Sequence, residues 1–204
     1  MTEFGWRKAV TDYIAVEALP HDKLGHMARL YALAVRIGRM ESLEWDDEIL
    51  FAATWMHDLG VFLGHRPKEK AELERWNHVP YTVARTRELL AGWGFPEEKL
   101  HAVAEAIETH QPADNPVTTE AILLRDADIL EQLGAIGALR ALVKTGRDSR
   151  YPSFSSVMPV LQGALKQLPA RLRLNSSRLL AAPRVDVLST LIAAIESEAG
   201  GLLM

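Results

Sequence analysis

The chain has 204 residues, of which 48% are hydrophobic and 25% are charged, and its formal net charge at pH 7 is −4. This length suits one domain with its own core, and the composition is that of a globular protein, which excludes a disordered chain. The slightly acidic balance disfavours a nucleic-acid partner, which would need a basic surface. The absence of cysteine excludes disulfides and thiolate ligands, so any metal must be held by His, Asp or Glu.

No segment joins a basic start to an apolar stretch in the manner of a signal peptide. No apolar run approaches the roughly 18 residues of a membrane span. The sequence therefore predicts a soluble, cytoplasmic protein without membrane contact.

Apolar residues recur at helical spacing along most of the chain, and no run shows the alternation of a strand. In chain order, we expect helices at 5–18, 24–40, 46–56, 78–92, 96–110, 118–143, 156–174 and 184–198. Pro183 suits the start of the last of them. The stretches 61–77 and 146–156 mix polar residues with Gly and Pro and are expected to be loops, the first with room for a short helix. The pattern predicts an all-α fold and a single domain over residues 1–204.

Four side chains that commonly bind metals lie inside or at the ends of apolar helical segments: His26, the adjacent pair His57 and Asp58, and Asp128. A buried imidazole or carboxylate is costly unless a partner satisfies it. Two neutral imidazoles and two carboxylates suit a divalent ion such as manganese, iron, nickel, magnesium or zinc. Each residue alone is more often an ordinary surface or core side chain, so the hypothesis depends on the set.

The pair His57 and Asp58 closes an apolar helical segment, and this position matters. Adjacent residues within a helix diverge by about 100° around its axis. At a helix end the backbone is less constrained, so both side chains can point at one ion.

The order and spacing of these residues resemble the HD-domain superfamily of metal-dependent phosphohydrolases over about residues 20–145. The family's first element, H-x-x-R-V, is similar to the phrase that begins at His26. Its second element, an apolar run ending in H-D-I-G or H-D-L-G, is similar to the phrase that ends at Gly60. A third element, D-A-D-R-L-D-x-L-G-x-x-G-x-x-R, is similar to residues 126–140.

Two departures from the third element are visible, since Ile129 stands in place of Arg and Glu131 in place of Asp. The missing Arg puts in doubt any substrate contact that it makes in relatives. Asp126 and Asp128 lie about 200° apart around a helix and therefore face opposite ways. In related families the ligand lies in a phrase A-D-x followed by Leu, Ile or Trp, which implies Asp128 as the ligand. Asp126 is then expected to serve a helix contact or a supporting hydrogen bond.

The resemblance implies an HD-type helical bundle over about residues 20–145 and additional C-terminal helices over about 150–204. Its implied metal ligands are His26, His57, Asp58 and Asp128. The implied activity is hydrolysis of a small phosphorylated substrate, for example a nucleotide, by a metal-activated water.

Catalytic roles are expected for Asp58 and Arg29. Asp58 would combine metal binding with orienting or deprotonating the water. Arg29 lies one helical turn beyond His26 on the same face, from which it could meet the substrate phosphate. The cations of residues 66–70 are expected to be ordinary surface charges.

Two further histidines could extend the site, since His78 opens one expected helix and His110 closes another. Dinuclear members of the superfamily place additional histidines in this interval. If both converge on the site, they could hold a second metal or contact a substrate phosphate. Otherwise each is a helix-terminal His bonded to the backbone.

Two alternatives to a phosphohydrolase remain open. An HD-fold di-iron oxygenase would require His78 and His110 as ligands and a carboxylate bridge from Asp58. A non-catalytic sensor or interaction module would keep the fold without turnover. The apolar stripes of the C-terminal helices would cover the bundle or form the surface of a homodimer.

Overall fold

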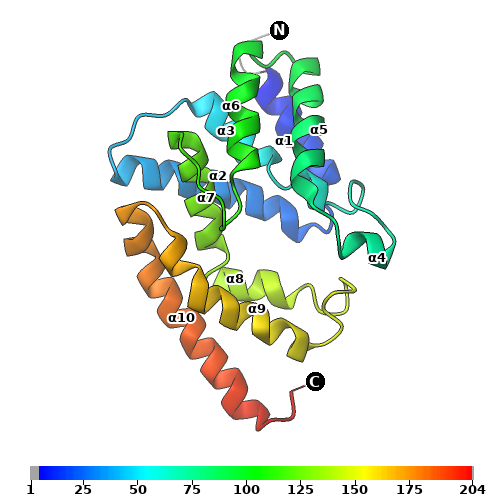
Figure 1. The fold of residues 1–204 in the computed structure, drawn as a ribbon, viewed down its shortest axis with the longest axis vertical. Helices are drawn as coiled ribbons and strands as arrows, with labels where there is room; N and C mark the ends of the chain where they lie inside the picture. Colours follow the sequence, from blue (N-terminus) through cyan, green and yellow to red (C-terminus); the bar gives the residue numbers. More distant parts are fainter. Residues whose placement is uncertain (1–4, 204) are drawn as a thin grey trace. The chain divides into compact units, whose positions relative to one another are not determined.

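The computed structural model describes residues 5–203, and every regular element among them is helical, which confirms the all-α prediction (Figure 1). The α-helices are α1 (Gly5–Glu17), α2 (Asp22–Met40), α3 (Asp47–Met56), α4 (Lys70–Leu73), α5 (His78–Gly92), α6 (Leu100–Glu108), α7 (Thr119–Glu131), α8 (Gly134–Leu142), α9 (Phe154–Gln167) and α10 (Asn175–Ala199). Short 3-10 turns lie at η1 (Leu59–Val61), η2 (Glu97–Lys99) and η3 (Pro169–Arg171).

The chain divides into two compact units, the first ending at Arg125 and the second beginning at Asp126. The organisation of residues 1–204 as a single domain stays a prediction. In the first unit, α3 packs against α1, α2 and α6, and α5 packs against α6 and η1. This contact pattern makes α3 the central helix of the unit.

The sequence of α3 explains its central place. Six of its ten residues are buried, so more than one face of the helix is covered. A helix that is apolar on most sides must lie in a core. The residues that directly follow it, His57 and Asp58, are thereby carried into the interior of the unit.

The N-terminus of α3 is capped by Asp46. Its carboxylate accepts hydrogen bonds from the backbone N–H groups of Glu48 at 2.9 Å and Ile49 at 3.3 Å. It also pairs with the ammonium of Lys99 at 2.6 Å. Burial raises the pKa of the Asp46 carboxyl, but the hydrogen bonds from Lys99 and the two backbone groups outweigh it, so the pKa lies below its usual value.

We expect Asp46→Ala to lower the free energy of unfolding at pH 7 by about 1–2 kcal/mol, because the cap and its ion pair are both lost. The measurement is urea unfolding followed by circular dichroism. Because the folded pKa is depressed, this contribution is present above the usual pKa of 3.8 and disappears as the pH falls through the folded value. The exposed Asp12 serves as the control. An equal loss in Asp12→Ala would contradict the capping role.

In the second unit, α8, α9 and α10 pack against one another. The predicted single helix over 118–143 is wrong, because α7 ends at Glu131 and α8 begins at Gly134. Gly134 has a φ of 71°, which residues with a side chain rarely adopt. A Cβ at Gly137 would lie 2.2 Å from the carbonyl oxygen of Gln132, so the tight turn needs glycine there too. The apolar pattern runs through this turn without interruption and therefore could not reveal it.

The last two predicted helices also differ from the structure. α9 ends before Pro169, and α10 continues through Pro183, so the prediction that Pro183 begins a helix is wrong. Proline cannot donate a hydrogen bond to the carbonyl four residues earlier, that of Leu179. Both residues are exposed, so water can satisfy this carbonyl and the helix can continue.

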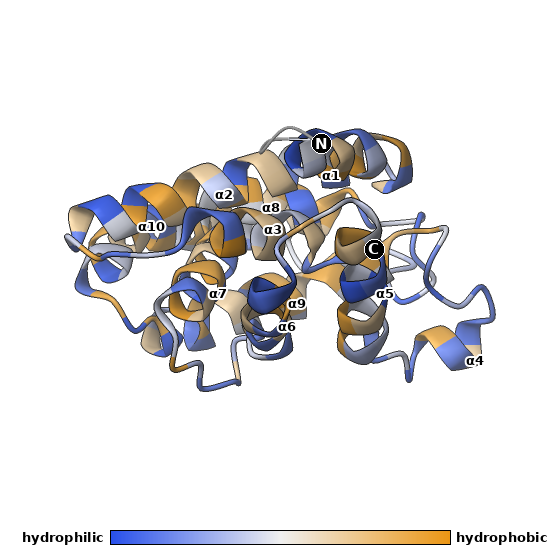
Figure 2. Cartoon of the chain, turned by 90° about the horizontal axis from the view of Figure 1, so that it is seen from above, coloured by the Kyte–Doolittle hydropathy of each residue, from blue (hydrophilic) through white to orange (hydrophobic). Residues whose placement is uncertain are grey.

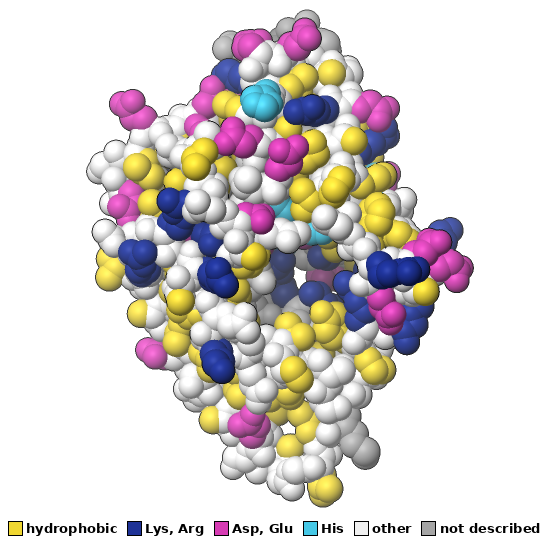
Figure 3. All heavy atoms as spheres, viewed as in Figure 1, with side chains coloured by type: hydrophobic (Ala, Val, Ile, Leu, Met, Phe, Trp, Pro, Cys, Tyr) yellow, Lys and Arg dark blue, Asp and Glu magenta, His cyan; other side chains and the backbone are white. Residues whose placement is uncertain are grey.

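Apolar and polar residues alternate along the helices in Figure 2, as expected of amphipathic helices. On the face drawn in Figure 3, Lys and Arg side chains lie among Asp and Glu side chains, in keeping with the small net charge. Within residues 5–203, no helix combines the length and the hydrophobicity that a membrane span requires.

Candidate metal site

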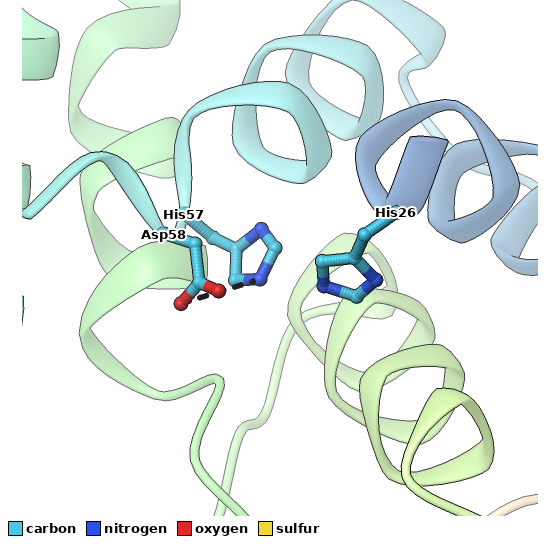
Figure 4. Close-up of side chains that lie close together, drawn as sticks. All are labelled: His26, His57 and Asp58. Atoms are coloured by element: carbon cyan, nitrogen blue, oxygen red, sulfur yellow. Dashed lines mark ion pairs between the residues drawn. The ribbon is translucent and has the colours of Figure 1, made fainter. Parts of the chain in front are cut away.

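Three of the predicted ligands lie together in the first unit, as Figure 4 shows. His26 comes from the second turn of α2, and His57 and Asp58 directly follow α3. One ligand atom of each residue lies within 4.8 Å of the others. The ring centroids of His26 and His57 are 5.5 Å apart. These distances are compatible with three ligands of a single ion.

The end of α3 is what brings the two adjacent residues together. His57 keeps helical angles, with φ −55° and ψ −31°, whereas Asp58 leaves the helix with φ −104° and ψ 13°. The Oδ1 atom of Asp58 lies 3.7 Å from Nε2 of His57. Within a continuous helix the two side chains would diverge by about 100°.

Backbone hydrogen bonds define which nitrogen of the imidazole rings faces the cluster. The Nδ1 atom of His57 lies 2.9 Å from the carbonyl oxygen of Thr54, and that of His110 lies 2.6 Å from the carbonyl oxygen of Ile107. A carbonyl oxygen can only accept, so Nδ1 donates and the neutral ring carries its lone pair on Nε2. This is the tautomer that binds a metal through Nε2.

A second group of potential ligands shares Asp58 with the first. One ligand atom each from Asp58, His78 and His110 lies within 4.8 Å of the others. The Nε2 atom of His78 is 3.6 Å from Oδ1 of Asp58. The ring of His110 lies 5.1 Å from that of His57 and 5.5 Å from that of His78, between centroids. His78 and His110 therefore lie beside His57 and Asp58. Their binding of a second metal or of a phosphate stays a prediction.

Gly60 allows α5 to approach Asp58 closely. Its N–H donates to Oγ1 of Thr82 at 3.0 Å, and its carbonyl oxygen accepts from the indole N–H of Trp76 at 2.8 Å. A Cβ on Gly60 would lie 2.9 Å from both the carbonyl oxygen of His78 and Oγ1 of Thr82. A side chain at this position would push α5 away, so glycine is what permits His78 to lie beside Asp58.

The carboxylate of Asp58 is the centre of charge in the cluster. Its side chain is 14% exposed, and its Oδ2 atom lies 3.6 Å from Nζ of Lys23. Burial raises the pKa of the Asp58 carboxyl, but attraction by His57, Lys23 and the other nearby histidines outweighs it, so the pKa lies well below its usual range. Asp58 is therefore ionised at neutral pH, as a ligand of a cation must be.

Lys23 is a site residue that sequence reasoning missed. Lys23 and Arg29 both lie three residues from His26 on the same helix, so spacing alone cannot distinguish them. The side chain of Lys23 is 15% exposed and contacts Asp58, whereas Arg29 is exposed. A catalytic role for Arg29 stays a prediction.

The two acids at the end of α7 belong to the second unit and have different partners. The carboxylate of Asp126 is fully buried and accepts hydrogen bonds from the backbone N–H groups of Arg173, at 3.2 and 3.1 Å, and Leu174, at 3.0 Å. These two residues directly precede α10, so Asp126 connects α7 to the segment that leads into α10, in keeping with its predicted role in a helix contact. The carboxylate of Asp128 accepts from the side-chain amide of Gln132 at 3.0 Å. Its part as the fourth metal ligand stays a prediction.

The chain is similar to several solved structures, whereas no curated protein matches it. Among solved structures, the chain is similar to YpgQ of Bacillus subtilis, with a TM-score of 0.72, 24% identity and coverage of 98% of this chain and 99% of that one. The structure of YpgQ in complex with ADP gives a TM-score of 0.71, 25% identity and coverage of 98% of both chains. A third similar structure is an HD-superfamily hydrolase of Bacillus thuringiensis, with a TM-score of 0.66, 19% identity and coverage of 96% of this chain and 97% of that one.

These structural likenesses confirm the predicted HD-type helical fold. The family model of the HD domain matches residues 24–133, a segment that includes His26, His57, Asp58 and Asp128. Because this match covers more than half of its 204 residues, the chain belongs to the HD-domain family.

Proposed function

We propose that the protein is a metal-dependent phosphohydrolase acting on a small phosphorylated substrate, with nucleotides as the favoured class. The observation that carries the proposal is the cluster of His26, His57 and Asp58, whose ligand atoms lie within 4.8 Å of one another. Its imidazole donors suit iron, nickel or zinc, and its carboxylate also suits manganese, whereas magnesium prefers a full set of oxygen ligands. Such an ion, when bound, activates water and neutralises charge on a phosphoryl group.

Each residue of the cluster has a distinct proposed role. The buried rings of His26 and His57 hold the ion, and Asp128 is the proposed fourth ligand. Asp58 holds the ion and orients the attacking water by accepting its hydrogen bond.

The choice of a nucleotide rests on one relative. Bacillus subtilis YpgQ has been solved in complex with ADP and is 25% identical to this chain across 98% of both. A nucleoside phosphate carries the anionic oxygens that a divalent cation attracts.

Removal of the metal is expected to lower phosphate release by about 10³-fold or more, because several kcal/mol of transition-state stabilisation depends on the ion. The protein would be dialysed against a chelator and assayed with nucleotides and sugar phosphates, before and after return of single metals. Metal content would be measured in parallel by mass spectrometry. Full activity in protein shown to be metal-free would refute the proposal.

A second candidate is an HD-fold di-iron oxygenase, favoured by the group of Asp58, His78 and His110. This group shares its carboxylate with the first group, as two ions bridged by Asp58 would require. Two irons per chain together with oxygen consumption and no phosphate release would select the oxygenase. Metal bound without any turnover would instead indicate a sensor or interaction module.

A further inference from the structure

We infer that Lys23 is a catalytic residue whose ammonium contacts a phosphoryl oxygen of the substrate beside the metal. The inference rests on the proposed phosphohydrolase function and adds a residue to its site.

The geometry around Asp58 carries the inference. Its Oδ1 atom faces Nε2 of His57 at 3.7 Å and Nε2 of His78 at 3.6 Å. Its Oδ2 atom faces Nζ of Lys23 at 3.6 Å. One oxygen of the carboxylate is thus directed at the imidazoles that could bind the ion, and the other is directed at the ammonium. Lys23 therefore lies beside the ligand cluster, in contact with the carboxylate that both groups of potential ligands share.

The distance from Lys23 to Asp58 leaves the ammonium able to bind a further anion. A strong charge-assisted hydrogen bond is about 2.7–2.9 Å long, and the observed 3.6 Å is longer than that. An ammonium has three N–H donors. Lys23 is thus attracted to Asp58 and kept near it, without a short hydrogen bond that a substrate oxygen would have to replace.

Exposure indicates the side from which a substrate would enter. His26 and His57 are fully buried. The side chains of Lys23, Asp58 and His78 are 15%, 14% and 19% exposed. A phosphorylated molecule arriving from solvent would meet these three groups first, and Lys23 is the cation among them.

The chemistry of phosphoryl transfer gives this cation a function. Negative charge on the phosphoryl oxygens must be neutralised in the transition state, and a positioned cation in a partly buried site does so more effectively than water. The compact charge of a lysine suits this task. Lys23 would act together with the ion on the same phosphoryl group.

The test uses inorganic phosphate as the probe on manganese-loaded protein. Lys23→Met removes the charge and keeps the apolar stem, Lys23→Arg keeps the charge, and Lys8→Met, at a side chain that is 77% exposed on α1, is the matched control. Isothermal titration measures the affinity first for Mn²⁺ and then for phosphate. Circular dichroism checks the fold, and Lys23→Gln replaces the Met variant if that variant does not fold.

We expect Lys23→Met to weaken phosphate binding about tenfold, as the loss of one charged hydrogen bond implies. Binding of Mn²⁺ should not weaken, because loss of a neighbouring positive charge cannot reduce the attraction of a cation. Lys23→Arg should retain most of the phosphate affinity, and Lys8→Met should match the parent protein.

Two results would overturn the inference. Unchanged phosphate affinity in Lys23→Met would show that the ammonium does not contact the anion. A parallel fall in Mn²⁺ affinity would show that Lys23 only positions Asp58. Failure of the parent protein to bind any divalent metal is a different result, since it rejects the proposed function before any variant is compared.

Discussion

Asp58→Asn is expected to lower kcat for phosphate release by about 10³-fold or more, because several kcal/mol of stabilisation by the ion depends on its ligands. Asp58 is common to both groups of potential ligands, so its charge serves every ion that the cluster could hold. Asparagine has nearly the same size but no charge. Its amide would also direct N–H donors at the imidazoles or at the ion.

The assay would pair kcat on the best nucleotide with the affinity for Mn²⁺ by isothermal titration. Asp12→Asn, on the exposed face of α1, is the matched control and should leave both quantities unchanged. If Asp58→Asn retained full activity, the assignment of the site would fail. If it bound Mn²⁺ as tightly as the parent protein but lost turnover, Asp58 would act on the water alone.

Asp126→Ala is expected to lower the free energy of unfolding by about 3 kcal/mol, because it leaves buried donors without their acceptor. The carboxylate accepts from the backbone N–H groups of Arg173 and Leu174. These donors directly precede α10, which begins at Asn175, so no carbonyl group within the helix accepts from them. The substitution should therefore loosen the attachment of α10 to the end of α7.

Asp128→Ala is the matched comparison, since it lies two residues further along the same helix. If Asp128 is the metal ligand, this variant should lose at least tenfold in Mn²⁺ affinity, roughly the smallest effect seen when groups that support a metal site are removed. Asp126→Ala should bind Mn²⁺ like the parent protein at temperatures where it is folded. Thermal unfolding and metal titration of both variants give the comparison. The reverse pattern would assign the metal to Asp126.

Local features of the chain are sufficient to predict most helices and three residues of the candidate site. The apolar periodicity of residues 5–56 predicts α1, α2 and α3, and Asp46 marks the start of the third. The pair His57 and Asp58 closes an apolar segment, which predicts that it is buried, and the central place of α3 explains this burial. Such features depend only on residues that are close together in the sequence, so they can be predicted before the fold is known.

Other features depend on segments that are distant in sequence. Lys23 and Arg29 are equivalent by spacing, and only the packing of α2 beside the end of α3 places Lys23 against Asp58. His78 reaches the same carboxylate because α5 packs on Gly60, a contact between residues far apart along the chain. Periodicity also continues through Gly134 and past Pro183. It therefore reveals neither the turn between α7 and α8, where Gly134 has a φ of 71°, nor the continuity of α10, which the exposure of Pro183 permits. Spacing along one helix shows which residues share a face. Which side chains of other helices lie against that face is decided by the packing of the helices.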